Sequence, residues 1–126
     1  MFRRSLIFVA ALAVIALAVV ACGGGASSGG STGGGTPLDV TVNLSEFKFD
    51  PATVNANAGQ TVNLTVVNKG SVVHTWVLAA ANVKMSVDPG KSATKTFTAP
   101  AAGTYDIVCD EAGHKEAGMV GKFIVK

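Results

Sequence analysis

Apolar and polar residues alternate along much of the segment from residue 38 to residue 126. The stretches 38–44 and 62–66 show this most clearly, because every second side chain is Leu or Val. Alternation with period two is typical of a half-buried β-strand, and no stretch of this segment has a convincing helical period. Turn residues such as Asp88-Pro89-Gly90 separate the stretches. The sequence therefore predicts an all-β domain, an antiparallel β-sandwich of many short strands.

Four further strands are expected in the same segment. Residues 72–78 are apolar and β-branched enough to be buried on both faces, and residues 93–98 alternate as an edge strand would. Residues 104–109 and 121–126 complete the set, with the last closing the chain. The whole segment of 89 residues is long enough for one small domain with one core.

The amino-terminal residues have a different character and are not expected to belong to the folded domain. Two arginines precede an apolar stretch from residue 6 to residue 21, which is short for a bilayer span. Residues 19–23, Val-Val-Ala-Cys-Gly, resemble the lipobox of bacterial lipoproteins. That resemblance implies a lipoprotein signal peptide over residues 1–21 and lipidation of Cys22. An ordinary signal peptide with a chance cysteine and an uncleaved anchor are the alternatives.

A glycine-rich spacer follows Cys22. Eight of the fourteen residues from 23 to 36 are glycine, and most of the others are Ser, Thr or Ala. Such a chain cannot bury apolar surface, so residues 22–37 are predicted to be a lipidated cysteine with a flexible linker. The linker would reach roughly 20 Å. We therefore expect an exported protein, lipid-anchored to the outer face of a bacterial membrane, periplasmic or cell-surface.

Charge excludes one class of partner. Once residues 1–21 are removed, eight lysines face eight acidic residues, and no cluster of basic residues remains. Nucleic-acid binding needs a basic surface, so no nucleic-acid partner is expected. Electrostatic steering by net charge should be weak, and we expect a monomer.

The residues with the most specific chemistry lie near the carboxyl end. Cys109 is followed after four residues by His114 and after four more by Met119, and His74 is the only other histidine. One thiolate, two imidazoles and one thioether are the ligand set of a mononuclear type 1 copper site. Cys109 would otherwise be an unexplained thiol in an exported protein. The sequence therefore predicts one copper ion bound by His74, Cys109, His114 and Met119.

The expected strands place these residues at one end of the sandwich. Cys109 ends one strand, His114 lies on the following loop, and Met119 begins the next strand. Gly113 and Gly118 allow the tight turns that such a loop needs. His74 comes from a different strand, so we expect the metal to bridge the two sheets.

Other sites with the same residues remain possible. A zinc site could use Asp110, Glu111 or Glu116 in place of Met119. A thiol enzyme could pair Cys109 with His114, although this leaves His74 without a role. A multicopper enzyme needs more ligands than two histidines provide, so the chain is not expected to be an enzyme.

The segment 38–126 resembles a cupredoxin of the plastocyanin and azurin family, and more narrowly the membrane-tethered auracyanin type. The resemblance is carried by Gly103-Thr104-Tyr105, Cys109, Gly113-His114 and the run 116–122, Glu-Ala-Gly-Met-Val-Gly-Lys. It implies a cupredoxin-like Greek-key β-sandwich, copper ligation by the four residues named above, and electron transfer. Redox partners such as cytochromes or membrane electron-transfer complexes would dock around His114, beside Ala112, Ala117 and Gly118.

Departures from the family pattern lead to further expectations. Thr75 stands where the family often has asparagine, and together with backbone amides near Asp110 it is a candidate partner for the ligands. Only 34 residues separate His74 from Cys109, which predicts a trimmed sandwich. The alternative function is a copper carrier or store that delivers copper to another exported protein. A third possibility is a surface lipoprotein with a vestigial site.

Overall fold

The computed structural model describes residues 35–126. The expected signal peptide, the lipidated Cys22 and the linker up to residue 34 lie outside the described residues. Within residues 35–126, no helix has the length and apolar character needed to cross a membrane.

Nine strands and one short 3-10 helix make up the described part of the chain. They are β1 (Leu38–Ser45), β2 (Lys48–Asp50), β3 (Thr53–Ala56), β4 (Thr61–Asn68), β5 (His74–Leu78), η1 (Ala79–Ala81), β6 (Val83–Val87), β7 (Ser92–Thr98), β8 (Gly103–Val108) and β9 (Val120–Val125).

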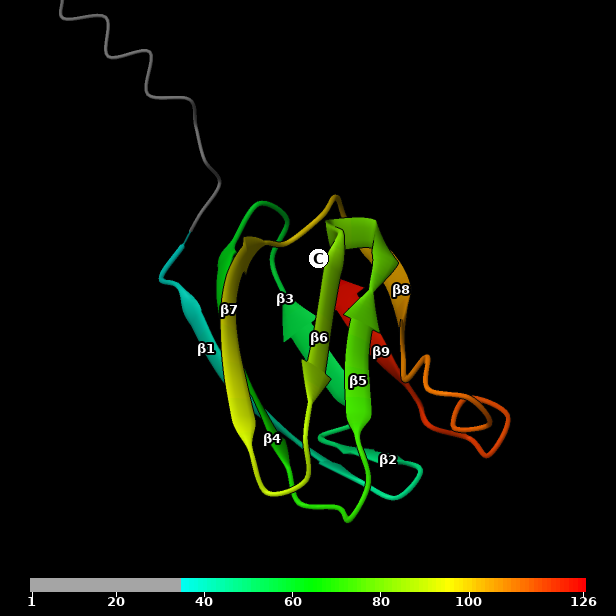
Figure 1. Cartoon of the computed structure of the whole chain (residues 1–126). Helices are drawn as coiled ribbons and strands as arrows, with labels where there is room; N and C mark the ends of the chain where they lie inside the picture. Colours follow the sequence, from blue (N-terminus) through cyan, green and yellow to red (C-terminus); the bar gives the residue numbers. More distant parts are fainter. Residues whose placement is uncertain (1–34) are drawn as a thin grey trace, which may run out of the picture.

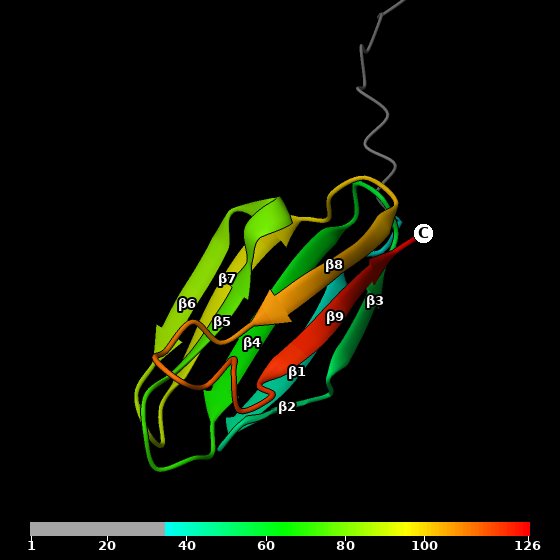
Figure 2. The same ribbon diagram turned by 90° about the vertical axis from the view of Figure 1, so that its right-hand side faces the viewer.

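The strands form two sheets that pack face to face, as Figures 1 and 2 show from two sides. One sheet has the order β2-β1-β4-β7 and the other has the order β3-β9-β8-β5-β6. The predicted all-β sandwich is confirmed. Two pairs, β1 with β4 and β3 with β9, are parallel, and the other five pairs are antiparallel.

Alternation along the strands fills the space between the sheets. In β4, Val62, Leu64 and Val66 are buried while the residues between them are more exposed. The ring of Phe97, from the edge strand β7, lies 6.2 Å from that of Trp76 and 5.8 Å from that of Phe123. Each large apolar side chain that is fully buried contributes about 1.5–3 kcal/mol, so this layer is the main source of stability. The core is formed by Val42, Leu44, Phe49, Val54, Ala56, Val62, Leu64, Val66, Trp76, Leu78, Val83, Met85, Val87, Ala99, Ile107, Cys109, Met119, Phe123 and Val125.

Three strands of the structure have no counterpart among the predicted ones. β2 and β3 have three and four residues, which is too short for alternation to stand out from chance. β6 does alternate, since Val83, Met85 and Val87 are buried and the two residues between them are exposed, so its pattern could have predicted it. Between His74 and Cys109 the connections are short. The expected trimming relative to the family stays a prediction.

Candidate metal centre

The candidate ligands gather at one end of the five-stranded sheet. His74 is the first residue of β5, and Cys109 follows directly on β8, the neighbouring strand. His114 lies on the loop between β8 and β9, which projects from the sandwich in Figure 1. Because β5, β8 and β9 belong to one sheet, the expectation that the metal would bridge the two sheets is wrong. The order β9-β8-β5 brings the residues together within that sheet instead.

Three of the four predicted side chains meet. One ligand atom from each of His74, Cys109 and His114 lies within 4.8 Å of the others. The Nδ1 atoms of the two histidines are 3.2 Å apart, and Cys109 Sγ is 3.4 Å from His114 Nδ1. His74 and Cys109 are fully buried, and His114 is partly exposed. The cluster is therefore accessible only along the side of His114.

This geometry and donor set fit a metal ion. Two nitrogens bound to one ion at about 2.0 Å lie roughly 3.3 Å apart, close to the spacing of the two Nδ1 atoms. Two imidazoles and one thiolate in this arrangement are the equatorial set of a type 1 copper site. Cys109 forms no disulfide and is buried, so it is a protected thiol rather than an exposed one.

Backbone hydrogen bonds shape the loop that carries His114. The His114 N–H donates to the Glu111 carbonyl at 3.0 Å, and the Ala117 N–H donates to the Gly113 carbonyl at 3.1 Å. Gly113 has φ of 80° and Gly118 has φ of 97°, values that L side chains rarely adopt. The predicted need for glycine at these two turns is therefore met.

Met119 closes the same loop. It is fully buried, its N–H donates to the His114 carbonyl at 3.0 Å, and its carbonyl accepts from the Cys109 N–H at 3.2 Å. These bonds tie the backbone of Met119 to two of the clustered residues. Its role as the axial ligand stays a prediction.

Thr75 contacts the thiol as expected. Its backbone N–H donates to Cys109 Sγ at 3.4 Å, while its hydroxyl lies 3.5 Å from the same sulfur and 2.7 Å from Asp110 Oδ1. A hydroxyl has one proton, and the shorter, charge-assisted bond to the carboxylate is the stronger of the two. The backbone N–H is therefore the donor to the sulfur, and the hydroxyl links Thr75 to Asp110.

Asp110 extends this link to the surface. Its own N–H donates to Thr75 Oγ1 at 2.8 Å, and Lys84 Nζ lies 2.6 Å from its Oδ2. The hydrogen bond from Lys84, followed by that from Thr75, lowers the pKa of Asp110 below its usual value. The carboxylate is therefore ionised at neutral pH and fixes the residue after Cys109 against β5 and β6.

Asn68 is a structural residue of the site that was not among the predicted site residues. Its fully buried side-chain amide donates to the carbonyls of Val72 and Val87, both at 2.8 Å, and its Oδ1 accepts from the Gly70 N–H at 2.8 Å. These bonds hold the loop that leads into His74. In the sequence this asparagine stands at a strand end and is followed by Lys-Gly, which reads as an ordinary turn.

Burial sets the charge of His74. Desolvation, followed by repulsion from His114, lowers the pKa of His74 below 6.5. A metal-binding imidazole must be neutral, so the protein environment favours the form of His74 that can ligate.

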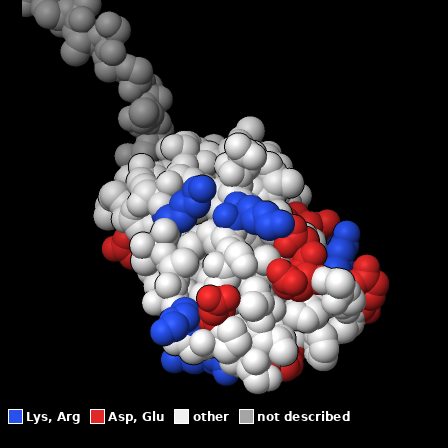
Figure 3. All heavy atoms as spheres, in the orientation of Figure 1, with Lys and Arg blue, Asp and Glu red and all other residues white. Residues whose placement is uncertain are grey.

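The neighbours of His114 include small and aromatic residues. Phe47 is 48% exposed and its ring stands edge-on to that of His114, with the centroids 5.4 Å apart. The predicted neighbours Ala112, Ala117 and Gly118 are all exposed. We call the surface formed by Phe47, Ala112, His114, Ala117 and Gly118 the His114 face. On the side of the molecule drawn in Figure 3, acidic and basic side chains are interspersed rather than gathered by sign.

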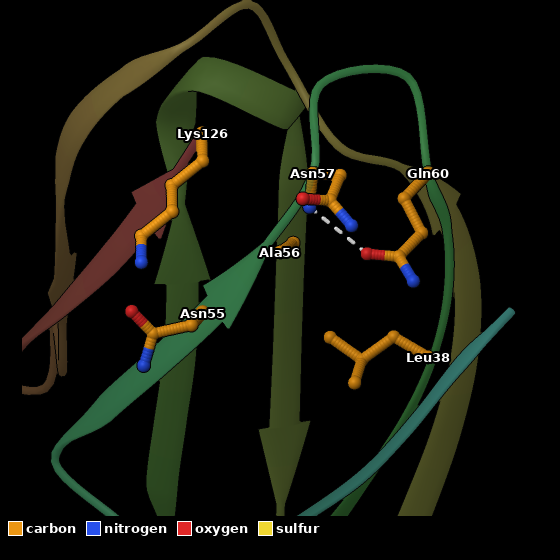
Figure 4. Close-up of a pocket in the computed structure, with 6 residues that line it drawn as sticks. All are labelled: Leu38, Asn55, Ala56, Asn57, Gln60 and Lys126. Atoms are coloured by element: carbon orange, nitrogen blue, oxygen red, sulfur yellow. Dashed lines mark hydrogen bonds between the residues drawn. The ribbon is translucent and has the colours of Figure 1, made fainter. Parts of the chain in front are cut away.

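A hollow of about 290 Å³ lies at the end of the sandwich where β1 begins, whereas the metal cluster lies near the end of β1. Figure 4 shows the hollow between Leu38, Asn55, Gln60 and Lys126. None of its lining residues is a histidine, a cysteine or a carboxylate, so it is separate from the candidate metal centre.

Comparison with known proteins agrees with this arrangement. The sequence model of a family described as a cupredoxin-like domain matches residues 9–125. The chain is 32% identical over 99 residues to the copper-resistant cuproprotein CopI of Rubrivivax gelatinosus, covering 63% of this chain and 60% of CopI. It therefore spans three fifths of that relative. It is 33% identical over 111 residues to auracyanin A of Chloroflexus aurantiacus, covering 64% of this chain and 68% of auracyanin A.

Solved structures give the same result. Auracyanin B superposes with a TM-score of 0.64 at 28% identity, covering 73% of this chain and 91% of auracyanin B. Auracyanin A from Chloroflexus aurantiacus, described as a "blue" copper protein, gives a TM-score of 0.62 at 27% identity, covering 71% and 99% of the two chains. The sandwich, the clustered His74, Cys109 and His114, and these relatives lead to one conclusion: the chain belongs to the cupredoxin-like family and its cofactor is copper.

Proposed function

We propose that this chain is a one-electron carrier in which His74, Cys109, His114 and Met119 hold a single type 1 copper ion. The observation that carries the proposal is the buried cluster of two imidazole nitrogens and one thiol sulfur, with His114 alone of the three reaching the surface. When bound, the ion supplies reversible one-electron chemistry between Cu(I) and Cu(II).

The protein residues have defined tasks in this function. Cys109 supplies a soft thiolate, which suits both oxidation states. The N–H of Thr75 donates to that thiolate, and the hydrogen-bonded loop of His114 keeps the donor atoms in nearly the same place before and after an electron moves. Burial of His74 and Cys109 excludes water from the donors. A set of four protein donors leaves no position for a substrate, which favours a carrier over an enzyme.

The His114 face is the proposed docking surface for redox partners. Its residues are small or aromatic, and Phe47 and His114 are in ring contact. An electron would enter or leave through the partly exposed imidazole, the shortest protein route from the cluster to solvent. The partners would be other redox proteins, such as cytochromes or membrane electron-transfer complexes. Because residues 22–126 contain eight lysines and eight acidic residues, their net charge is close to zero, so docking would depend little on long-range steering.

Export and anchoring belong to the same proposal. The lipobox-like run before Cys22 and the glycine-rich spacer support a lipid-anchored protein on the outer face of a bacterial membrane. Expression in a bacterium followed by mass analysis of the amino-terminal peptide tests this. The peptide should begin at Cys22 with a diacylglycerol attached, and the Cys22→Ser chain should lack it.

A copper carrier that delivers the metal to another exported protein is the second candidate. It is favoured by the similarity to CopI, whose name describes a copper-resistant cuproprotein. The ligands would be the same, but the metal would leave the site during function.

Visible absorption and electron paramagnetic resonance of the full chain after addition of Cu(II) test the proposal. Intense blue or green colour with narrow copper hyperfine splitting is expected. Repeated oxidation and reduction in the presence of a Cu(I) chelator then separates the candidates, because an electron carrier should retain copper and a delivery protein should lose it. A chain that never binds copper contradicts both.

A further inference from the structure

The ring of His74 has one nitrogen in the cluster and one outside it. Nδ1 faces His114, whereas Nε2 is buried and has no hydrogen-bond partner in the part of the chain that the structure describes. A neutral imidazole that binds a metal through Nδ1 must carry its proton on Nε2. Metal binding therefore fixes an N–H donor on the buried side of the ring, where the lack of an acceptor is destabilising.

A carboxylate lies on that side of the ring, across Gly70. A Cβ atom built on Gly70 would lie 2.8 Å from His74 Nε2 and 2.8 Å from Glu46 Oε1. His74 Nε2 and Glu46 Oε1 are therefore no farther apart than the sum of these two distances. Any side chain at position 70 would occupy the space between them. Asn68 Oδ1 is the other nearby acceptor, but it belongs to a neutral amide that already accepts the Gly70 N–H, so the ionised carboxylate is the stronger acceptor.

Ser71 holds the Glu46 carboxylate in this position. The Ser71 N–H and hydroxyl both donate to Oε1, at 2.5 and 2.8 Å. These bonds and the N–H of Glu46 itself lower the pKa of the carboxyl to about 2, so it is ionised at neutral pH. A carboxylate has about four acceptor sites; the two bonds from Ser71 fill those of Oε1 and leave those of Oε2 for a further donor.

The turn that carries Glu46 reaches both histidines. Glu46 and Phe47 are the two residues between β1 and β2, and Phe47 has φ of 58°, an unusual value for an aromatic residue. The Phe47 ring contacts His114, while Glu46 lies behind His74. The turn therefore faces the buried His74 Nε2, which has no hydrogen-bond partner among the described residues.

We propose that Glu46 is a positioning residue that accepts a hydrogen bond from His74 Nε2–H when His74 Nδ1 binds copper. The proposal rests on the copper site proposed above. A carboxylate behind a metal-bound histidine fixes the tautomer and the ring orientation, and it makes the imidazole a stronger donor. A stronger donor favours Cu(II) over Cu(I), so Glu46 should lower the reduction potential.

Glu46→Gln in the full chain is the first test. Glutamine keeps the shape and can still accept from Ser71, but it loses the charge. Loss of such an outer partner typically costs 10–100-fold in metal affinity, so Cu(II) affinity should fall within about that range. A tenfold loss that Cu(I) does not share raises the potential by about 59 mV. Glu116→Gln is the matched control, because it removes an exposed carboxylate of the His114 loop.

Gly70→Ala is the second test, with Gly35→Ala as its control. The new Cβ at position 70 would contact both Glu46 and His74, whereas one at position 35 would meet nothing within 4 Å. In the Cu(I) form, the His74 Nε2–H proton should be protected from exchange in the wild type and in both controls. It should exchange faster in Glu46→Gln and in Gly70→Ala.

The results separate this inference from the proposed function. Suppose that the wild type shows the thiolate-copper band, and that Glu46→Gln and Glu116→Gln both have the wild-type potential and the wild-type protection of His74 Nε2–H. The proposal for Glu46 is then wrong, and the copper site stands. If the wild type binds no copper, the proposed function and this inference fail together.

Discussion

The two histidines of the chain have ring centroids only 4.9 Å apart, yet they are held in different ways. His114 sits on a loop whose backbone bonds join residues close in sequence, and its ring is partly exposed against Phe47. His74 is fully buried at the start of β5. Its loop is fixed by Asn68, and its surroundings include Glu46 from a distant turn.

This difference separates a local half of the site from a long-range half. The local half, residues 109–119, carries the thiol of Cys109, the imidazole of His114 and the thioether of Met119 on and beside one loop. The long-range half is His74 with Asn68 and Glu46, which come from β5, from the end of β4 and from the turn after β1. We expect changes in the long-range half to cost folding stability and changes in the local half to alter the metal with little effect on the fold.

The largest effect on the metal should come from Cys109→Ser, which removes the donor of the local half that also contacts Thr75 of β5. The visible charge-transfer band should be lost completely, because a hydroxyl does not replace a thiolate. The Thr75 N–H can still donate to the new oxygen, so apo-protein stability should change by less than about 2 kcal/mol. Absorption spectra and urea unfolding check this. Persistence of the colour would show that Cys109 is not a ligand.

Asn68→Ala breaks the long-range half. It removes the side-chain bonds to the Val72 and Val87 carbonyls and from the Gly70 N–H, and we expect a loss of about 3 kcal/mol in the free energy of unfolding. Asn63→Ala, on the exposed side of the same strand, should cost under about 1 kcal/mol. Urea unfolding of the apo-proteins measures both. Equal losses would remove the distinction between the two halves.

Met119→Leu probes the end of the local half. The volume is nearly conserved, so stability should fall by less than about 1.5 kcal/mol. The variant should keep copper but have a higher potential, because a weak donor to Cu(II) is lost. Voltammetry tests this against Met85→Leu, a buried methionine on β6 that is not a predicted ligand. A potential that matches the control would show that Met119 is not axial.

The smallest effect on stability should come from the ion pair of Lys122 with Asp106, which belongs to neither half of the site. The hydrogen bond and the charge of Lys122 lower the pKa of Asp106 below 3.8, and both side chains are more than half exposed. A depressed pKa means that the pair stabilises the fold above about pH 3.8 and that this is lost as pH falls through the lower, folded value. Solvent screening keeps the contribution small.

Lys122→Met should therefore unfold at a slightly lower urea concentration than the wild type at pH 7. The difference should shrink toward zero as the pH falls below 3.8. Lys95→Met, on the exposed strand β7, is the reference for loss of a lysine without this pair. If the difference between Lys122→Met and the wild type grew on acidification, Lys122 would stabilise the fold through a group other than Asp106.

Local patterns were enough to predict much of the fold and most of the site. Alternation in residues 38–44 and 62–66 indicated strands because the pleat sends successive side chains to opposite faces. The spacing of Cys109, His114 and Met119 indicated a metal site because those residue types share one chemistry. β2 and β3 escaped prediction because three or four residues carry too little pattern.

The sequence alone determined the β-sandwich, the copper chemistry and the three candidate ligands of the carboxyl-terminal loop. Only the tertiary structure decided that His74 and Cys109 come from neighbouring strands of one sheet, so that the metal does not bridge two. It alone placed Asn68 under the His74 loop and Glu46 behind the buried nitrogen. The physical reason is that strand order and register are set by packing across the whole domain, and no short-range pattern encodes which distant turns will meet.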